Sequence, residues 1–256
     1  MEQQGMKHEI VWLAETDSTN LEVMRRFRAG AEEGLLVSAD QQTAGRGRRG
    51  RTWVTPPGGN IAMSLLLKPE IVPDDAPQIT LIAAMAVRQA VLRVTGVSGM
   101  IKWPNDITVD GKKITGILTE MELAGLKIGC VVVGIGINVN LTEYPPEVAK
   151  VASSLKLITG REWDRKEIVR AFLEEFDRYY DVFLQNGCTF AALRQEYDSM
   201  LVNCGREVLI TEEGREIRAR AVGVDERGQL IVKLPDDSER HIYAGEVSVR
   251  GIYGYT

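Results

Sequence analysis

The sequence predicts an α+β fold, in which a mixed, largely antiparallel sheet flanked by helices precedes a small C-terminal β-barrel. Two turn signals, Asp110-Gly111 and Ala124-Gly125, separate β-rich segments, and strands joined by tight turns pair antiparallel. Long helical patterns lie on both sides of these strands. Beyond residue 203 the sequence changes to short, regularly spaced strands, as in small closed barrels. We therefore expect two domains, residues 1–202 and 203–256.

The first elements are a strand, a helix and two further strands. The β-rich segment at Val11 ends before Asp17, and Thr19 and Glu22 then have the spacing of a helical capping box. Apolar residues recur at helical intervals until Gly30, namely Leu21, Met24 and Phe27. Residues 35–40 read as a strand that leads into a loop rich in arginine, and the apolar run 61–67 reads as a buried strand.

The central elements are a helix followed by a β-meander. A long apolar helical pattern covers about residues 74–95. A β-rich segment at 100–109 then meets the hairpin signal Asp110-Gly111, the returning strand covers 112–123, and a further strand covers 127–139.

Helices and short strands complete the chain. Aromatic residues recur at helical spacing over 164–186, which predicts a helix whose rings belong to the core, and a second helix is expected over 190–200. Turns such as Glu213-Gly214 and Arg227-Gly228 separate the short strands of the expected barrel, which cover 207–211, 217–224, 230–233, 238–243 and 247–250.

Composition excludes several classes of protein. The formal net charge of the 256 residues is −5, and the apolar runs are too short or too interrupted to span a bilayer. The N-terminus lacks the apolar segment of a secretory signal. Three widely spaced cysteines and two histidines offer neither a disulfide framework nor a zinc site. We expect a cytoplasmic protein with reduced thiols, no membrane association and no structural metal.

The most informative segment is residues 45–51, which hold four arginines and three glycines. Glycines prevent a stable helix and let the backbone approach a ligand closely. Positive charge concentrated in an acidic protein indicates a local anionic target. A solvated surface segment or a nucleic-acid patch is the alternative, but no second basic cluster accompanies it. A mobile cationic flap over a phosphate or a carboxylate fits better.

Three further segments carry polar groups among apolar residues. They are DSTN at 17–20, KWPND at 102–106 with GKKITG at 111–116, and GIGINVN at 134–140. Taken singly, each has a simpler explanation, such as helix capping, solvated lysines or a chance glycine pair. Together with the flap, these segments supply the cationic and polar side chains needed to bind a triphosphate and a carboxylate. Because the sequence offers no Ser/His/Asp set and no activated cysteine, we expect catalysis by charge stabilisation.

These segments, in this order, resemble the catalytic domain of biotin–protein ligases. The shared motifs are DSTN, QQTAGRGRRGRTW, KWPND, GKKITGIL and VGIGINVN, and the resemblance runs from about Trp12 to Tyr253. It implies a class II synthetase-like catalytic domain and an SH3-like C-terminal barrel. Since the motifs begin within the first twenty residues, we expect a monofunctional ligase without the N-terminal DNA-binding domain of some relatives, and no specific DNA binding.

The resemblance also implies a two-step, AMP-forming reaction. Biotin and ATP give biotinyl-5′-AMP with Mg²⁺ as cofactor, and a lysine of a biotin carboxyl carrier protein, from acetyl-CoA carboxylase or a related carboxylase, then takes the biotin. A homodimer is possible.

Matching the motifs residue by residue implies a set of site residues, with no protein ligand assigned to the metal. The expected catalytic residues are Lys113, Arg48 and Lys102. The expected biotin contacts are Ser18, Thr19, Asn20, Gln42, Gly45, Arg46, Gly47, Arg48, Trp53, Lys113 and Gly116. The expected ATP and adenylate contacts are Arg48, Trp53, Lys102, Asn105, Asp106, Gly134, Ile137 and Asn138.

Three alternatives stay open at this point. A lipoate–protein ligase or an octanoyltransferase shares the fold class, and selectivity depends on a ring-contact shape that the sequence does not display. A non-catalytic biotin sensor or a nucleic-acid-binding protein would have a different function altogether. Release of pyrophosphate that depends on both ATP and biotin separates the ligase from these last two.

Overall fold

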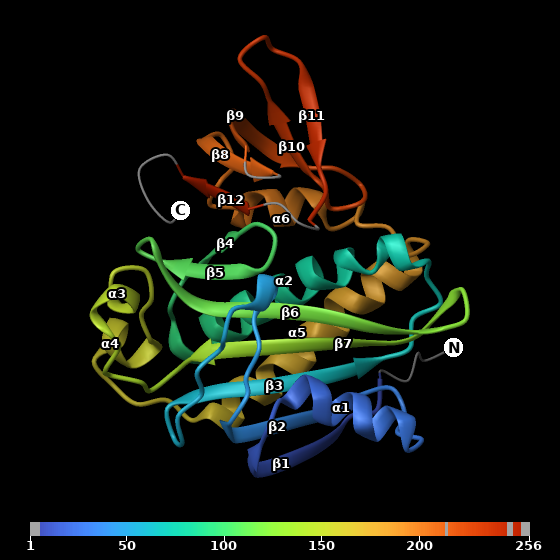
Figure 1. Cartoon of the computed structure of the whole chain (residues 1–256), viewed down its shortest axis with the longest axis vertical. Helices are drawn as coiled ribbons and strands as arrows, with labels where there is room; N and C mark the ends of the chain where they lie inside the picture. Colours follow the sequence, from blue (N-terminus) through green and yellow to red (C-terminus); the bar gives the residue numbers. More distant parts are fainter. Residues whose placement is uncertain (1–5, 213–214, 245–247, 252–256) are drawn as a thin grey trace.

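A computed structural model describes residues 6–212, 215–244 and 248–251. A seven-stranded sheet forms the centre of the molecule, and a five-stranded sheet stands beyond its β4–β5 edge (Figure 1). Both the mixed α+β class and the separate C-terminal β-domain are therefore confirmed.

The central sheet is mixed, with the strand order β1-β2-β3-β7-β6-β5-β4. Only β1 and β2 run parallel, and every other neighbouring pair is antiparallel. The strands are β1 (Glu9–Thr16), β2 (Leu35–Gln42), β3 (Asn60–Leu67), β4 (Met100–Lys102), β5 (Asp106–Val109), β6 (Lys112–Ala124) and β7 (Lys127–Asn138). The segment predicted at 100–109 is thus two strands, with the KWPND motif at the turn between them.

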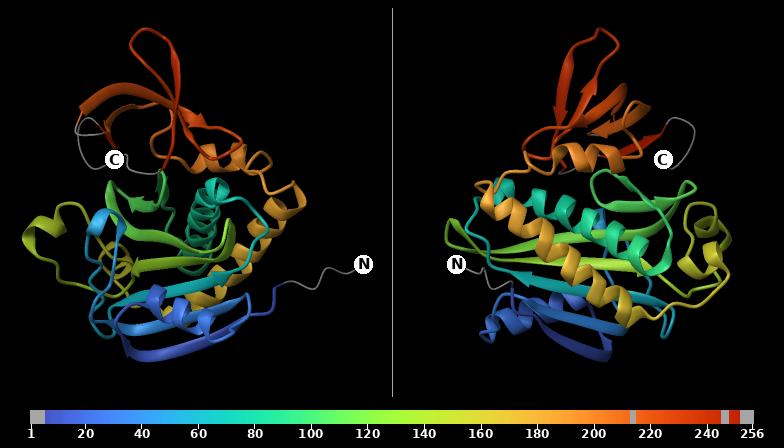
Figure 2. Two further views of the ribbon diagram at one scale, coloured as in Figure 1. Left: turned by 45° about the vertical axis from the view of Figure 1, so that its right-hand side comes forward. Right: turned by 180° about the vertical axis from the view of Figure 1, so that it is seen from behind.

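Helices cover both faces of this sheet. Helix α1 (Thr19–Arg28) lies on one face, and the long helices α2 (Pro77–Thr95) and α5 (Arg165–Gln185) cover the other (Figure 2). The short elements are α3 (Pro146–Ala149), α4 (Leu155–Thr159), α6 (Arg194–Met200) and the 3-10 turns η1 (Arg48–Gly50) and η2 (Pro73–Asp75). Helices α3 and α4 were not predicted from the sequence, because one or two helical turns carry too few residues to show a period.

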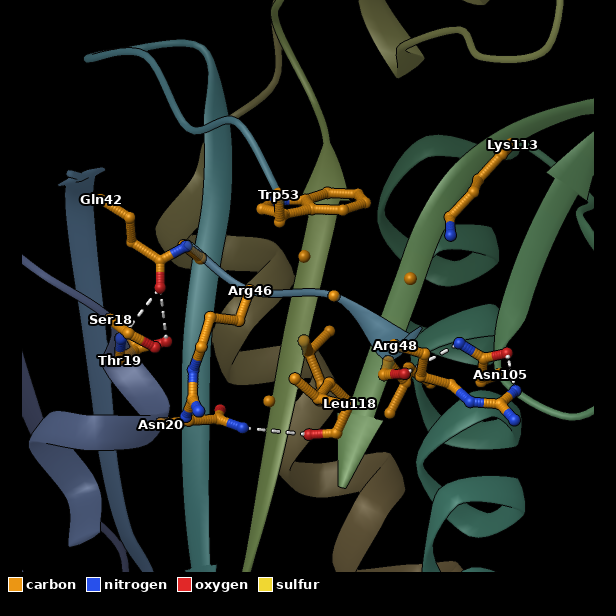
Figure 3. Close-up of a pocket in the computed structure, with 17 residues that line it drawn as sticks. Ser18, Thr19, Asn20, Gln42, Arg46, Arg48, Trp53, Asn105, Lys113 and Leu118 are labelled. Carbon is orange, nitrogen blue, oxygen red and sulfur yellow. Dashed lines mark hydrogen bonds between the residues drawn. The ribbon is translucent and has the colours of Figure 1, made fainter. Parts of the chain in front are cut away.

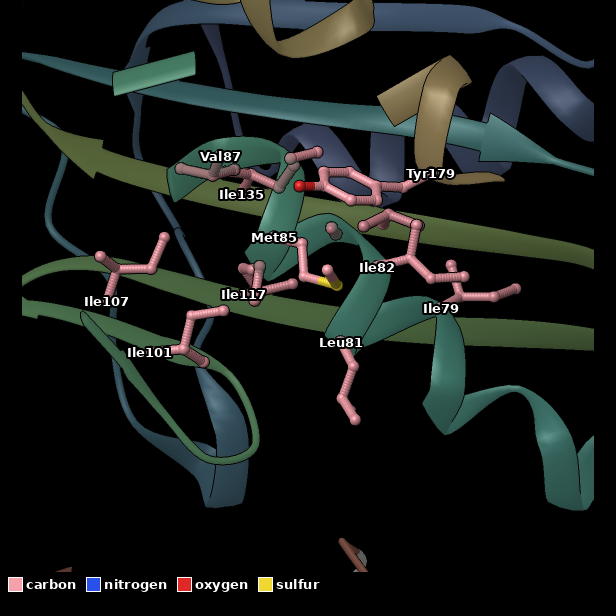
Figure 4. Close-up of a cluster of buried hydrophobic side chains, with 14 of the residues drawn as sticks. Ile79, Leu81, Ile82, Met85, Val87, Ile101, Ile107, Ile117, Ile135 and Tyr179 are labelled. Carbon is pink, nitrogen blue, oxygen red and sulfur yellow. The ribbon is translucent and has the colours of Figure 1, made fainter. Parts of the chain in front are cut away.

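The core lies between the sheet and helices α2 and α5. Ile79, Ile82 and Met85 of α2 meet Ile117 of β6 and Ile135 of β7, and all five are almost fully buried (Figure 4). The aromatic residues of α5 complete this layer, and neighbouring rings lie 5.4–5.6 Å apart between centroids for Phe172, Phe176 and Tyr180. The aromatic stripe is therefore core, as predicted.

Two predicted helix starts are wrong. Ser18, not Thr19, is the N-cap of α1, and its side chain makes no capping hydrogen bond. Thr19 instead donates from its backbone N and its Oγ1 to Gln42 Oε1, so a tertiary contact replaces the capping box. Helix α6 begins at Arg194 rather than at 190, because the Phe190 N–H donates to the Glu226 carbonyl and holds the chain outside a helix there.

The C-terminal sheet is antiparallel throughout and fits the expected SH3-like barrel, with the strand order β11-β10-β9-β8-β12. Its strands are β8 (Glu207–Glu212), β9 (Arg215–Val224), β10 (Leu230–Lys233), β11 (Glu239–Ile242) and β12 (Ser248–Gly251). The predicted turn Glu213-Gly214 and the predicted strand start at Val247 lie outside the described residues. The domain boundary at residue 203 stays a prediction.

Side chains on both sides of the boundary hold the C-terminal sheet against the rest of the molecule. The indole Nε1 of the buried Trp103 donates to the Gly228 carbonyl at 3.0 Å. Arg227 also pairs with Asp75 at 2.8 Å, just before α2. Over the described part of the chain, no helix combines the length and the apolar character needed to cross a bilayer.

A histidine links the start of β1 to α5 and makes stability depend on pH. His8 Nδ1 lies 3.2 Å from the Gly34 carbonyl O, and Nε2 lies 2.9 Å from Asp177 Oδ1, so both ring nitrogens face acceptors. Burial opposes the charged ring, but the hydrogen bond and charge of Asp177, with the Gly34 carbonyl, leave the pKa of His8 raised above 6.5.

Because the pKa of His8 is raised in the folded state, the charged ring contributes to the free energy of unfolding. This contribution is complete below the pKa of the unfolded state and is lost as the pH rises through the pKa of the folded state. His8→Gln is therefore expected to destabilise the protein by about 1 kcal/mol near pH 5.5 and by clearly less near pH 9. Urea unfolding of both proteins across this range measures the difference. A difference that does not change with pH would contradict the assignment.

Candidate active site

Small residues on three neighbouring strands hollow out one face of the central sheet. Ala62 of β3 and Gly116 of β6 are the cross-strand partners of Gly136 on β7, and Ser64 is a partner of Gly134. Directly paired residues share a face of the sheet, so these positions form a common floor. A cavity of about 50 Å³ lies over it, and its wall includes the side chains labelled in Figure 3.

Gly134 and Gly136 of β7 are required by close neighbours rather than by backbone conformation. A Cβ added at Gly136 would lie 2.1 Å from Trp53 Cε2, and one at Gly134 would lie 2.1 Å from Asn20 Oδ1. The alternating residues Val133, Ile135 and Ile137 belong to the core cluster. The pattern VGIGIN therefore combines a core face with a face that side chains from other elements approach closely.

The start of α1 brings three polar residues to one end of the cavity. Asp17 orients this turn by accepting a hydrogen bond from the Ser18 backbone N at 2.7 Å, and the Arg25 guanidinium holds the pKa of that carboxyl well below its usual range. Thr19 contacts Gln42, and Asn20 Nδ2 donates to the Leu118 carbonyl at 3.2 Å. The Ser18 hydroxyl lines the cavity and, within the described residues, makes no hydrogen bond. It is available to a ligand.

The arginine segment folds across the cavity as a short, irregular hairpin. Arg46 and Thr52 form an isolated β-bridge, and the Gly47 N–H donates to the Arg51 carbonyl at 2.7 Å. Gly45 has no room for a side chain, since an added Cβ would lie 2.2 Å from the Trp53 carbonyl O. The absence of a side chain at Gly45 therefore lets the backbone of the 45–51 segment pack directly against the backbone of Trp53.

Arg48 connects this segment to two other parts of the molecule. Its Nη1 donates to Asn105 Oδ1 at 2.9 Å, and its Nη2 donates to the Ala244 carbonyl in the C-terminal sheet domain at 2.5 Å. Burial lowers the pKa of Arg48 from its ordinary value; the charges of Arg49 and Arg51 act in the same direction, whereas Asp106 opposes them. An anion beside this guanidinium would relieve that burial cost.

Lys113 reaches the cavity because of an irregularity in strand β6. The pairing of β5 with β6 shifts between Ile107 and Thr108, so Ile114 is an extra residue on β6. Such a bulge reverses the side to which the preceding side chains point. Lys113 thereby joins Gly116 on the wall of the cavity, and its Nζ pairs with Asp106 Oδ1 at 2.6 Å. The 151–153 segment fixes its backbone, since Lys113 N donates to the Val151 carbonyl at 2.8 Å.

Trp53 covers the glycine floor. Its ring lies beside the Lys113 ammonium, with 5.7 Å between Nζ and the ring centroid. The indole Nε1 is buried and has no hydrogen-bond partner among the described residues. A buried, unsatisfied donor is costly, so it is suited to a ligand that supplies an acceptor.

Most of the predicted site residues meet at this cavity. It is lined by Ser18, Thr19, Asn20, Gln42, Arg46, Gly47, Arg48, Trp53, Asn105, Lys113, Gly116 and Gly134. Their individual roles remain predictions.

Five predicted residues do not line the cavity. The Ile137 side chain is fully buried in the core, because strand alternation turns it to the opposite face from Gly136. Its predicted contact with the adenylate stays a prediction, and the side chain does not face the cavity. Asn138 Nδ2 donates to the Ser153 carbonyl, and Gly45 packs against the backbone carbonyl of Trp53. Lys102 and Asp106 are buried cross-strand partners at the KWPND turn. They do not line the cavity themselves, but Asp106 contacts Lys113, which does.

Several residues that shape the site were not predicted from the sequence. The apolar or glycine members of the wall are Ala62, Ile117, Leu118, Ile135 and Gly136. Ser64 lies 2.8 Å from Thr19 Oγ1, and Glu120 accepts hydrogen bonds from both Asn20 and Arg46. Strand alternation with Gly134 was the available signal for Gly136. The roles of Ser64 and Glu120 can be recognised only once the pairing register of the strands is known.

A second cavity of about 310 Å³ adjoins the first and shares Arg48, Asn105, Ile117 and Leu118 with it.

Comparison with known proteins agrees with the family resemblance of the sequence motifs. The sequence pattern of the biotin/lipoate A/B protein ligase family matches residues 12–138, and that of the biotin protein ligase C terminal domain matches residues 204–250. The biotin--[acetyl-CoA-carboxylase] ligase of Paracoccus denitrificans is 33% identical over 228 residues, which are 87% of this chain and 93% of that protein. The bifunctional ligase/repressor BirA of Bacillus subtilis is 36% identical over 221 residues, 86% of this chain and 67% of that protein.

The similarity extends to three dimensions. The biotin protein ligase of Aquifex aeolicus, solved in complex with biotin and ATP, superposes with a TM-score of 0.81 at 32% identity and covers 96% of this chain and 100% of that one. The chain therefore belongs to the biotin protein ligases of the biotin/lipoate A/B protein ligase family.

Proposed function

We propose that this protein joins biotin to ATP as biotinyl-5′-AMP, with release of pyrophosphate, and then transfers the biotin to a lysine of a biotin carboxyl carrier domain. The observation that carries the proposal is the cavity itself. It combines a glycine-lined floor, the polar start of α1 and three cationic side chains, Arg46, Arg48 and Lys113. A compact bicyclic ligand with a carboxylate tail has complementary chemistry at each of these parts.

In the first step, one carboxylate oxygen of biotin attacks the α-phosphorus, and the bond to the pyrophosphate oxygen breaks. Because both reactants are anions, their repulsion has to be offset by fixed positive charge. We assign this role to Lys113 and Arg48, which both line the cavity. Lys113 is held by Asp106 in the structure, so an anionic ligand would compete for a cation that is already in position.

The second step needs an anhydride that water does not reach. Trp53 covers the floor of the cavity, and the segment 45–51 crosses its mouth and contacts the C-terminal domain through Arg48. Such a cover protects a reactive intermediate until the acceptor arrives. The lysine amine of the carrier then attacks the carbonyl carbon, AMP leaves with its bonding electron pair, and an amide forms. We propose a carboxylase carrier domain as the acceptor because relatives such as the Paracoccus protein are named for acetyl-CoA carboxylase.

Magnesium enters this proposal with the nucleotide. Within the described residues, no group of three or more histidine, cysteine, aspartate or glutamate side chains is arranged to hold a metal. Mg²⁺ is usually held by one or two carboxylates together with substrate phosphates, so a dedicated protein cage is not required. Asp106 Oδ1 lies 2.6 Å from Lys113 Nζ at the cationic end of the cavity, and we propose this carboxylate as a contact of the metal. Bound Mg²⁺ would neutralise phosphate charge.

Mass spectrometry of a carrier domain tests the function. The purified protein, incubated with MgATP, biotin and the carrier domain, is expected to add the mass of one biotin less one water to the carrier. Omission of ATP, or replacement of the acceptor lysine by arginine, is expected to abolish the gain.

Two parallel measurements separate the competing functions. A mass gain with lipoate and none with biotin would identify a lipoate ligase and contradict the proposal. Biotin binding without release of pyrophosphate would instead indicate a sensor.

A further inference from the structure

A carboxylate at the edge of the site joins three elements that are distant in sequence. Glu120 Oε2, on strand β6, accepts a hydrogen bond from Asn20 Nδ2 of α1 and from Arg46 Nη2 of the 45–51 segment, each at 2.7 Å. Its side chain is 26% exposed, and it lines the second cavity beside Leu118. Figure 3 shows Arg46 and Asn20 meeting here.

Three polar neighbours hold the Asn20 amide in one orientation. Its oxygen lies 2.6 Å from Ser64 Oγ, and its nitrogen donates to the Leu118 carbonyl and to Glu120. A rotated amide would direct its NH₂ group at Ser64 and its oxygen at two acceptors. Glu120, together with the Leu118 carbonyl, therefore fixes the orientation of the Asn20 side chain, which packs against Gly134 on the cavity floor.

Arg46 is held by the same oxygen. The side chain of Arg46 is 38% exposed, so solvent competes for it, and the charged acceptor keeps the guanidinium over the cavity. Since Arg46 belongs to the segment that crosses the cavity, the Glu120 contact also ties that segment to the sheet. Arg48 provides the second tie, through Asn105 and Ala244.

We propose that Glu120 is a positioning residue for the ligation reaction. It orients Asn20 for biotin and anchors Arg46, so that the 45–51 segment stays closed over the adenylate. This inference rests on the proposed function. Glu120 is not placed in contact with the reacting atoms, and its two partners predict two separable effects.

The experiment compares Glu120→Gln, Glu120→Ala and the matched control Glu122→Gln. Glu122 lies two residues further along β6 and makes a similar ion pair, at 2.6 Å with Arg28, but it does not line either cavity. Glutamine keeps an acceptor for Asn20 and removes the charge opposite Arg46. Alanine removes both.

For Glu120→Gln we expect the adenylate to dissociate about tenfold faster while the KM for biotin changes less than about twofold. For Glu120→Ala we expect the faster dissociation together with a KM for biotin raised about tenfold. Glu122→Gln is expected to leave both values unchanged. Because Glu120→Gln is nearly isosteric, its kinetics remain measurable even if the alanine variant does not fold.

A double variant tests whether the pair acts as a unit. If Glu120 works through Arg46, Arg46→Gln with Glu120→Gln releases the adenylate no faster than Arg46→Gln alone. Additive effects, or a wild-type dissociation rate in Glu120→Gln, would overturn the inference. Wild-type protein that forms adenylate while Glu120→Gln behaves like Glu122→Gln would refute the positioning role alone. Wild-type protein that forms no adenylate would refute the proposed function, and this inference with it.

Discussion

Replacement of Lys113 by alanine is expected to slow formation of biotinyl-5′-AMP by about 100- to 1000-fold, the usual effect of removing one preorganised charge-stabilising group. The bulge at Ile114 and the backbone contact with Val151 hold Lys113 on the cavity wall. Its ammonium needs only to exchange Asp106 for a phosphate or carboxylate oxygen. Little reorganisation is required at the moment of reaction, which is why the expected loss is large.

Single-turnover adenylation with saturating ATP and biotin measures this effect directly. The adjacent Lys112 provides a matched control, because it carries the same charge on the same hairpin but is exposed and lies outside both cavities. Lys112→Ala is expected to behave as wild type. A Lys113→Ala protein that forms the adenylate at the normal rate would refute the role of Lys113.

Gly136→Ala is expected to raise the KM for biotin, or to lower the adenylation rate, by about 10- to 100-fold, as overpacking of a close-fitted site does. The new methyl group would lie 2.1 Å from Trp53 Cε2, and ring atoms cannot approach a carbon so closely. Trp53 therefore has to move off the floor and lose its place beside Lys113. Both the wall of the cavity and the shielding of the intermediate would be damaged.

The steric origin of this effect is checked with Gly59→Ala. An added Cβ at Gly59 would have its nearest neighbour at 3.5 Å, an ordinary contact, and the residue does not line the cavity. We expect this control to retain wild-type kinetics. Normal kinetics in Gly136→Ala would show that Trp53 is not required over the floor.

The sequence allowed the main elements of the fold to be predicted, because local signals and tertiary structure agree there. Asp110 and Gly111 both adopt positive φ, 49° and 75°, as the hairpin signal requires, and they join β5 to β6. The aromatic stripe of α5 faces the core as its spacing indicates. Where a tertiary partner competes with a local signal, prediction fails, and Thr19 is the clear case, since Gln42 takes the hydroxyl that a capping box would use.

Chemistry and spacing likewise identified the motifs of the site, since cations and glycines are recognisable in the sequence itself. The register between strands decided which of them meet. Alternation on β7 turns Ile137 into the core and Gly136 toward Trp53, and a single extra residue on β6 brings Lys113 to the cavity. Glu120 gains its importance from Asn20 and Arg46, which lie 100 and 74 residues away in the chain. Contacts at such separations depend on how strands pair and helices pack, and no local pattern encodes them.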